Sequence, residues 1–164
     1  MAATWVSLAG KYEVSDDGDL VILGELVQDV QTGTSPAVGN YLSSEVFWGG
    51  KISATIEFHD TVEESACEIM LFRNPQTNGF VTAGLGSAKP FMYEIRSWSE
   101  NNWTYHSVYG NIENLHPNRK YHIEVVLEGS RIKLFSDSVL ISDFEFPYFL
   151  NQSYVGIWSL SKGK

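Results

Sequence analysis

Residues 121–141 read YHIEVVLEGSRIKLFSDSVLI and residues 154–159 read YVGIWS, and these two segments decide the fold. At the start, every second side chain is apolar and falls on one side of an extended chain, while most residues between them are polar. The members of this apolar face are Tyr121, Ile123, Val125 and Leu127. Glu128 and Gly129 mark a tight turn, after which the alternation resumes. The pattern predicts three short strands between Tyr121 and Trp158 and has no helical interpretation.

The rest of the chain repeats this pattern, which predicts about a dozen strands in the whole chain and no convincing helix. Turn signals such as Asn78-Gly79 separate the strands. Residues 28–40 are rich in Gly, Thr, Ser and Pro, and we expect a long loop there that crosses between sheets or covers a site. Many short strands with frequent turns are typical of packed antiparallel sheets. We therefore predict an all-β protein built as a two-sheet antiparallel β-sandwich.

Length and charge limit the other classes of protein. The chain has 164 residues, which favours one domain over residues 1–164 with a hydrophobic core of its own. Its formal net charge is −9, whereas a surface that binds phosphate groups must be basic. The charge therefore argues against nucleic acids and anionic membranes as partners. No apolar segment is long enough for membrane insertion.

Cys67 is the only cysteine, so an intrachain disulfide is excluded. It lies in an apolar strand, where we expect a buried thiol. The first residues lack the basic and apolar regions of a signal peptide. We expect a cytoplasmic protein if this N-terminus is the native one, and otherwise a domain taken from a longer protein.

Four segments resemble the concanavalin A-like lectin/glucanase superfamily, whose jelly-roll members include laminin G-like domains. The segments are LAGKYEVSDDGDLVI at 8–22, VFWGGKISATIEF at 46–58, CEIMLFRNPQTNGFVTAGLG at 67–86 with FMYEIRSW at 91–98, and the closing strands quoted above. The resemblance implies a jelly roll with ligands on the concave face of its front sheet. It does not decide between lectins, hydrolases and protein-recognition modules, all of which use this fold.

The strand 91–98 carries the best candidate site. Tyr93 and Ile95 fall on one face, which we expect in the core, and Glu94, Arg96 and Trp98 fall on the other. We expect Arg73 and His106 from neighbouring strands to join this second face. Carboxylate and guanidinium groups bind sugar hydroxyls, and aromatic rings stack on pyranose faces. The alternative is an ordinary cross-strand ladder of charges on a solvated face.

A second group of aromatic residues follows in the segment SWSENNWTYHSVYG at 97–110. Alternation predicts that Trp103, Tyr105 and Tyr109 share a face, and core packing is the favoured interpretation of these rings. Trp98 and Trp103 flank an Asn-rich turn, so we expect them to be the exposed pair.

Catalytic and metal-binding motifs are weak. The Glu-x-Asp-x-x-Glu pattern of the hydrolytic relatives is absent, which argues against that hydrolase class. The chain is also similar to keto-sugar hydrolases around IMLFRN and MYEIRSW, which would make Arg73 and Glu94 the matching positions. The four histidines have no zinc-ligand spacing. We predict no cofactor, with calcium at Asp16–Asp19 or Asp60–Glu64 as a weak alternative.

The sequence therefore predicts a non-catalytic, lectin-like carbohydrate-binding module. Its predicted contacts are Arg73, Glu94, Arg96, Trp98, Trp103 and His106. One alternative is a protein-recognition or sensory domain of a larger protein, and a less favoured one is a glycosidase-like hydrolase. Exposed, coplanar Trp98 and Trp103 would favour sugar. A flat apolar patch or sheet edge would favour a protein partner, and two facing carboxylates in a cleft would favour an enzyme.

Overall fold

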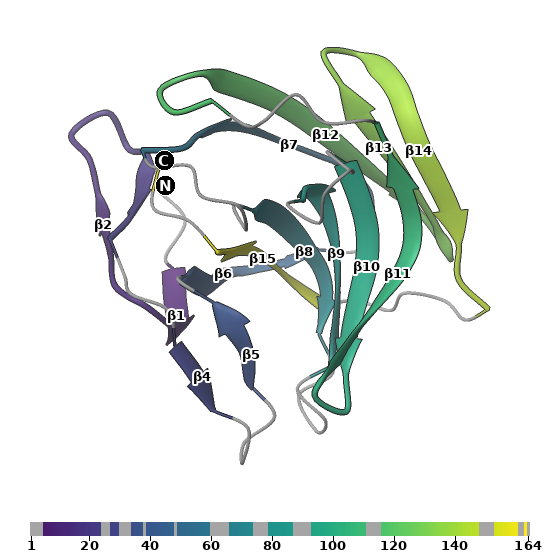
Figure 1. Ribbon diagram of the computed structural model, residues 1–164, viewed down its shortest axis with the longest axis horizontal. Coiled ribbons are helices and arrows are strands. Elements are labelled where there is room, and N and C mark those ends of the chain that lie inside the picture. Colours follow the sequence, from purple (N-terminus) through teal and green to yellow (C-terminus); the bar gives the residue numbers. More distant parts are fainter. Residues whose placement is uncertain are drawn as a thin grey trace.

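The computed structural model describes residues 5–23, 27–29, 34–37, 39–47, 49–59, 66–73, 79–86, 93–110, 116–147, 153–160 and 163. These residues form antiparallel strands and no helix, so none of them belongs to a helix able to cross a membrane. Two large sheets pack face to face, with two small hairpins to one side (Figure 1). The predicted β-sandwich is confirmed.

The larger sheet has seven strands, and their spatial order differs from their chain order. In space they run β1 (Trp5–Ala9), β6 (Gly39–Phe47), β15 (Ser153–Ser159), β8 (Cys67–Arg73), β9 (Phe80–Leu85), β10 (Tyr93–Ser99) and β11 (Asn102–Tyr109). Consecutive strands β8 to β11 are neighbours, which is the arrangement that short turns favour. β11 is the outer strand on that side.

The smaller sheet has four strands, in the order β14 (Val139–Glu145), β13 (Arg131–Ser136), β12 (Lys120–Glu128) and β7 (Gly50–Glu57). Two hairpins complete the described chain: β2 (Tyr12–Val14) with β3 (Leu20–Ile22), and β4 (Val27–Asp29) with β5 (Thr34–Ala37). The prediction of a long loop over residues 28–40 is wrong, because β5 lies within it and pairs with β4.

The main core lies between the two sheets and follows the predicted alternation. Along β12 the buried residues are the predicted set, Tyr121, Ile123, Val125 and Leu127. They pack against Ile69, Ala83 and Ile95 from the seven-stranded sheet. Full burial of an Ile or Leu side chain stabilises a fold by about 1.5–3 kcal/mol, so this contact holds the sheets together.

The seven-stranded sheet also buries side chains on its other face, which we call the outer face because it is turned away from the four-stranded sheet. A second apolar cluster lies there, made of Ala37, Ala66, Met70, Phe80, Trp98 and Trp158. Unlike the main core, this face also carries charged side chains beside its aromatic rings.

Candidate functional site

Two glutamates and an arginine meet on the outer face, and we call them the Glu-Arg-Glu cluster. Glu94 and Arg96 are on β10, and Glu68 is on β8, one strand beyond β9. Because Glu94 and Glu68 both pair with Gly84 of β9, their side chains start at the same level of the sheet. The glycine between them has no side chain to separate the two carboxyl groups.

Arg96 is held mainly by Glu68. Its Nε donates to both carboxylate oxygens of Glu68, at 3.1 and 2.9 Å, and its Nη2 lies 2.8 Å from Oε2. The Thr82 hydroxyl donates to the same Oε2 at 2.9 Å. Burial would lower the pKa of Arg96, but the carboxylates of Glu68 and Glu94 outweigh burial and raise it. The guanidinium therefore stays charged.

Aromatic rings surround the guanidinium on three sides. Its central carbon lies 3.7 Å from the ring centre of Trp103, 4.5 Å from that of Trp158 and 5.7 Å from that of Tyr105. Such cation–π contacts contribute about 0.5–2 kcal/mol each, most when water is excluded. Only 4% of Arg96 is exposed, so these rings replace much of its hydration.

Glu94 is the poorly satisfied member of the cluster. Its Oε1 lies 3.1 Å from Nε of Arg96, but no N–H or O–H among the described residues donates a hydrogen bond to either of its oxygens. Burial and the neighbouring Glu68 raise the pKa of Glu94 to about 9, although Arg96 opposes the shift. Glu94 is therefore protonated at neutral pH, when its own O–H can donate to Glu68.

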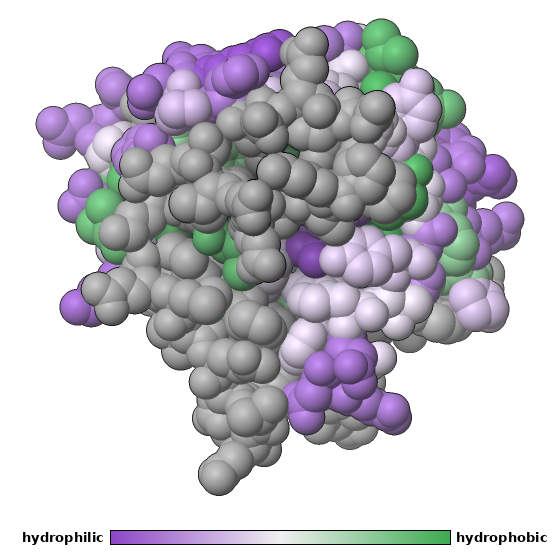
Figure 2. Space-filling view, in the orientation of Figure 1, coloured by the Kyte–Doolittle hydropathy of each residue, from purple (hydrophilic) through white to green (hydrophobic). Residues whose placement is uncertain are grey.

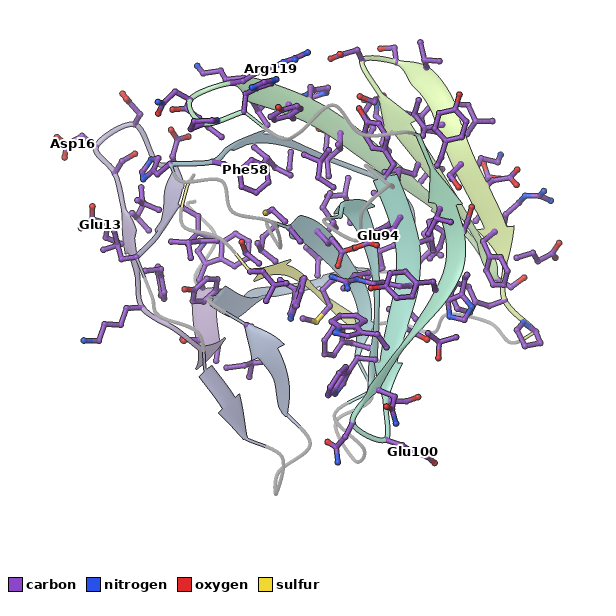
Figure 3. The ribbon with its side chains drawn as sticks, viewed as in Figure 1. Glu13, Asp16, Phe58, Glu94, Glu100 and Arg119 are labelled. Atoms are coloured by element: carbon purple, nitrogen blue, oxygen red, sulfur yellow. The ribbon has the colours of Figure 1, made fainter. Side chains whose placement is uncertain are left out.

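Gly86 makes room for the Glu94 carboxyl group. A Cβ atom placed on Gly86 would lie 2.0 Å from Cδ of Glu94, far inside van der Waals contact. Figure 3 shows the Glu94 side chain extending from β10 across the sheet, on the side of Glu68. Gly86 thus leaves the space that the buried carboxyl group of Glu94 occupies.

Tyr105 connects the Glu-Arg-Glu cluster to solvent. Tyr105 lies on β11, opposite Arg96 of β10, and 47% of its surface is exposed. Burial, and then the charge of Glu94, raise its pKa. The surface over β10 and β11 is mostly pale in Figure 2, with a small hydrophilic area at its border. A ligand approaching this surface would meet the Tyr105 ring before the charged groups.

The structure brings together three of the six predicted contact residues, Glu94, Arg96 and Trp103. Trp98 shares their face, but it is only 4% exposed and packs in the second apolar cluster. Its ring meets Trp103 edge-on at 64°, so the prediction of an exposed pair is wrong and the rings are not coplanar. Arg73 ends β8, and its side chain lies outside the described residues.

His106 lies on the opposite face, and its predicted place beside Arg96 is wrong. The register of β10 and β11 shifts between Ile95 and Arg96, so β11 has a β-bulge at this point. The bulge turns His106 toward the four-stranded sheet, where it contacts Phe144 and Phe146. Its Nε2 lies 2.8 Å from the Ser97 hydroxyl, and burial lowers its pKa.

The same bulge separates two tyrosines that alternation places together. Tyr109 pairs with Tyr93, whose hydroxyl bonds to Ser136 of the four-stranded sheet. Tyr109 therefore lies on the inner side of β11, opposite to Tyr105. The predicted common face of Trp103, Tyr105 and Tyr109 is correct only for the first two.

Sequence reasoning missed Glu68, Thr82 and Trp158 as parts of this site. A signal existed for Glu68, because it is the one charged residue in the apolar segment CEIML and falls out of phase with the core residues Cys67 and Ile69. A charge in such a strand needs a buried partner of opposite sign. The sequence could not show that Arg96 supplies it.

Two carboxyl groups face each other here, the arrangement we associated with an enzyme. However, Glu68 has no exposed surface, and both carboxyl groups contact one guanidinium. A glycosidase needs one carboxyl group free to attack or to activate water at the sugar, whereas Glu68 is held by Arg96 and Thr82. Among the described residues, no three His, Cys, Asp or Glu side chains gather in a way that could hold a metal ion.

No family model matches the chain, and no curated protein matches it in sequence. Its structure is similar to carbohydrate-binding module CBM66 from Bacillus subtilis, with a TM-score of 0.76 and 17% identity, over 97% of this chain and 89% of that one. It is similar to the Bacillus licheniformis β-glucanase, with a TM-score of 0.66 and 9% identity, over 99% and 80% of the two chains. A Bacillus subtilis protein of unknown function with a galectin-like fold gives a TM-score of 0.64 and 13% identity, over 97% and 84%.

These similarities show the fold, a jelly roll of the concanavalin A-like type, as the sequence resemblance predicted.

Proposed function

We propose that this chain is a non-catalytic carbohydrate-binding module whose ligand lies on the outer face, against Tyr105 and Trp103. The observation that carries the proposal is a buried carboxyl group, that of Glu94, whose two oxygens accept no hydrogen bond from the described residues. Leaving such atoms unsatisfied costs about 1–3 kcal/mol each, so folded proteins keep them mainly where something else binds.

The chemistry of these groups suits a sugar. Protonated Glu94 can both donate and accept a hydrogen bond, and so can a sugar hydroxyl group, so the two can pair. The exposed ring of Tyr105 offers an apolar surface to a pyranose, beside these polar groups. Two of the similar structures support the proposal, since one is described as a carbohydrate-binding module and another as a β-glucanase.

The test is titration of the protein against a panel of oligosaccharides, with and without calcium, followed by tryptophan fluorescence. Trp103 contacts Arg96 and should report a ligand nearby. We expect a saturable change with weak affinity, because a small exposed face orders few groups of the ligand.

Tyr105→Ala and Tyr109→Ala form a matched pair for this titration. Both tyrosines are on β11 and about half exposed, at 47% and 55%, but they lie on opposite faces. We expect Tyr105→Ala to weaken binding at least about tenfold and Tyr109→Ala to leave it unchanged. Equal effects of the two substitutions, or no binding by any sugar, would contradict the proposal.

A protein-recognition role remains the second candidate, and one observation favours it. Val139 and Leu140 are 61% and 50% exposed at the start of β14, the outer strand of the four-stranded sheet. An apolar outer strand is a surface on which another chain can pair. Leu140→Asp should leave sugar binding intact under our proposal, because β14 belongs to the four-stranded sheet and Tyr105 lies on the face of β11 turned away from that sheet.

A further inference from the structure

The charges of the Glu-Arg-Glu cluster do not balance when both carboxyl groups are ionised. Two carboxylates then share one guanidinium. Glu68 takes both hydrogen bonds from Nε of Arg96 and the hydroxyl of Thr82, so it is fully paired. Glu94 has only an ion-pair contact with the same Nε, at 3.1 Å. Among the residues that the structure describes, the cluster therefore lacks one positive charge, and it lacks it at Glu94.

No described side chain on the neighbouring strands supplies that charge. The groups that face Glu94 are Glu68 from β8, Arg96 from its own strand, and Tyr105 from β11. On β9 and directly after it, the adjacent positions are Thr82, Gly84 and Gly86, which carry no charge. Among the described residues, Arg96 is the one cation within ion-pair distance of Glu94.

We infer that the ligand brings the missing charge: it is a carbohydrate with a protonated amino group, an amino sugar, whose ammonium binds the carboxylate of Glu94. This inference rests on the proposed function. An ammonium group has three N–H donors, and Glu94 presents two oxygens that receive none. The chain's net charge of −9 also attracts cationic ligands and repels acidic sugars.

Binding must then release a proton. In the free protein a proton neutralises Glu94 at neutral pH. When the ammonium arrives, this proton leaves to solvent and the ion pair takes its place, so the charge of the cluster is unchanged. The affinity should therefore rise with pH, by up to about tenfold per pH unit, while the sugar amine stays protonated. A neutral sugar would show no such rise.

The experiment compares three tetrasaccharides with one β-1,4-linked backbone. They carry a hydroxyl, an acetamido or an amino group at C2: tetramers of glucose, of N-acetylglucosamine and of glucosamine. Calorimetric titrations at pH 5 and pH 6, where the amino group of glucosamine stays protonated, each in two buffers of different ionisation enthalpy, give affinity and proton release together. We expect the glucosamine tetramer to bind about tenfold tighter than the others and to release one proton.

Glu94→Gln provides the matched variant, since an amide has the shape of the protonated acid and cannot ionise. We expect it to lose the preference for the amino sugar, the proton release and the rise with pH, whereas Tyr109→Ala keeps all three. If the neutral tetramers bind as tightly and no proton is released, the inference is wrong and the proposed function stands. If no tetramer binds, both fail. If n-propylamine binds as tightly as the amino sugar, the sugar is not what the site recognises and the inference is again wrong.

Discussion

Glu94→Gln should change how the stability of the folded protein depends on pH, even without a ligand. Burial and Glu68 raise the pKa of Glu94 to about 9 against the opposing effect of Arg96, whereas its ordinary value is 4.5. Between these two values the folded protein keeps a proton that the unfolded chain has lost. The free energy of unfolding therefore falls as pH rises through this window, and the loss is complete above the folded pKa.

The magnitude follows from the size of the window. Each pH unit costs about 1.4 kcal/mol, so the wild-type protein should lose up to about 4 kcal/mol between pH 5 and pH 8 from this group. The amide that replaces the carboxyl group in the variant has no proton to lose. We expect the variant to match the wild type at pH 5 and to be more stable at pH 8 by up to that amount.

Urea unfolding followed by tryptophan fluorescence at pH 5, 6.5 and 8 measures this difference. Glu124→Gln is the control, because Glu124 pairs with Lys51 at 2.8 Å on the four-stranded sheet and the hydrogen bond from Lys51 lowers its pKa. That variant should show no gain in stability with rising pH. The reasoning is refuted if the free energies of the wild type and Glu94→Gln stay parallel from pH 5 to pH 8.

Other substitutions test separate contacts. Gly86→Ala should destabilise the fold by about 1–3 kcal/mol in urea unfolding, because the new Cβ displaces the Glu94 carboxyl group. The cost should shrink in a Glu94→Ala background, and an equal cost in both backgrounds would mean that the two groups do not clash. Burial raises the pKa of the Cys67 thiol to about 12, so it should resist a disulfide reagent at pH 8 until urea unfolds the chain; rapid labelling of the folded protein would show otherwise. Burial lowers the pKa of His106, so the wild type should lose stability as pH falls below 6.5, the ordinary value of this side chain. In thermal melts at pH 7.5 and 5.5, His106→Gln should lose less than the wild type, and equal losses would argue against this origin.

Local patterns predicted the sandwich because the alternation of apolar and polar residues within one strand indicates which of its faces is buried. In β12 the alternating apolar residues from Tyr121 to Leu127 are those that the core buries. In β10 the sequence correctly predicted Ile95 in the core and Arg96 on the other face. These assignments need no knowledge of which strand lies next to which.

The parts that failed depend on neighbours. Trp98 looked exposed because it lies next to a turn, yet Met70 and Trp158 from other strands bury it. Glu68 pairs with Arg96 across β9, at a separation of 28 positions that no local pattern reveals. Burial of a charge depends on such distant pairs. The sequence therefore predicts that a charge in an apolar strand needs a partner, but not which residue that partner is.

The bulge on β11 has a consequence for how this protein can diverge. The extra residue of the bulge, His106, determines that Tyr105 and not Tyr109 borders the Glu-Arg-Glu cluster. Loss of that residue would restore regular pairing and exchange the faces on one side of it, while every remaining amino acid stayed the same. When related chains are aligned, a one-residue gap at this position therefore marks a change in which tyrosine borders the cluster, and percentage identity would not register it.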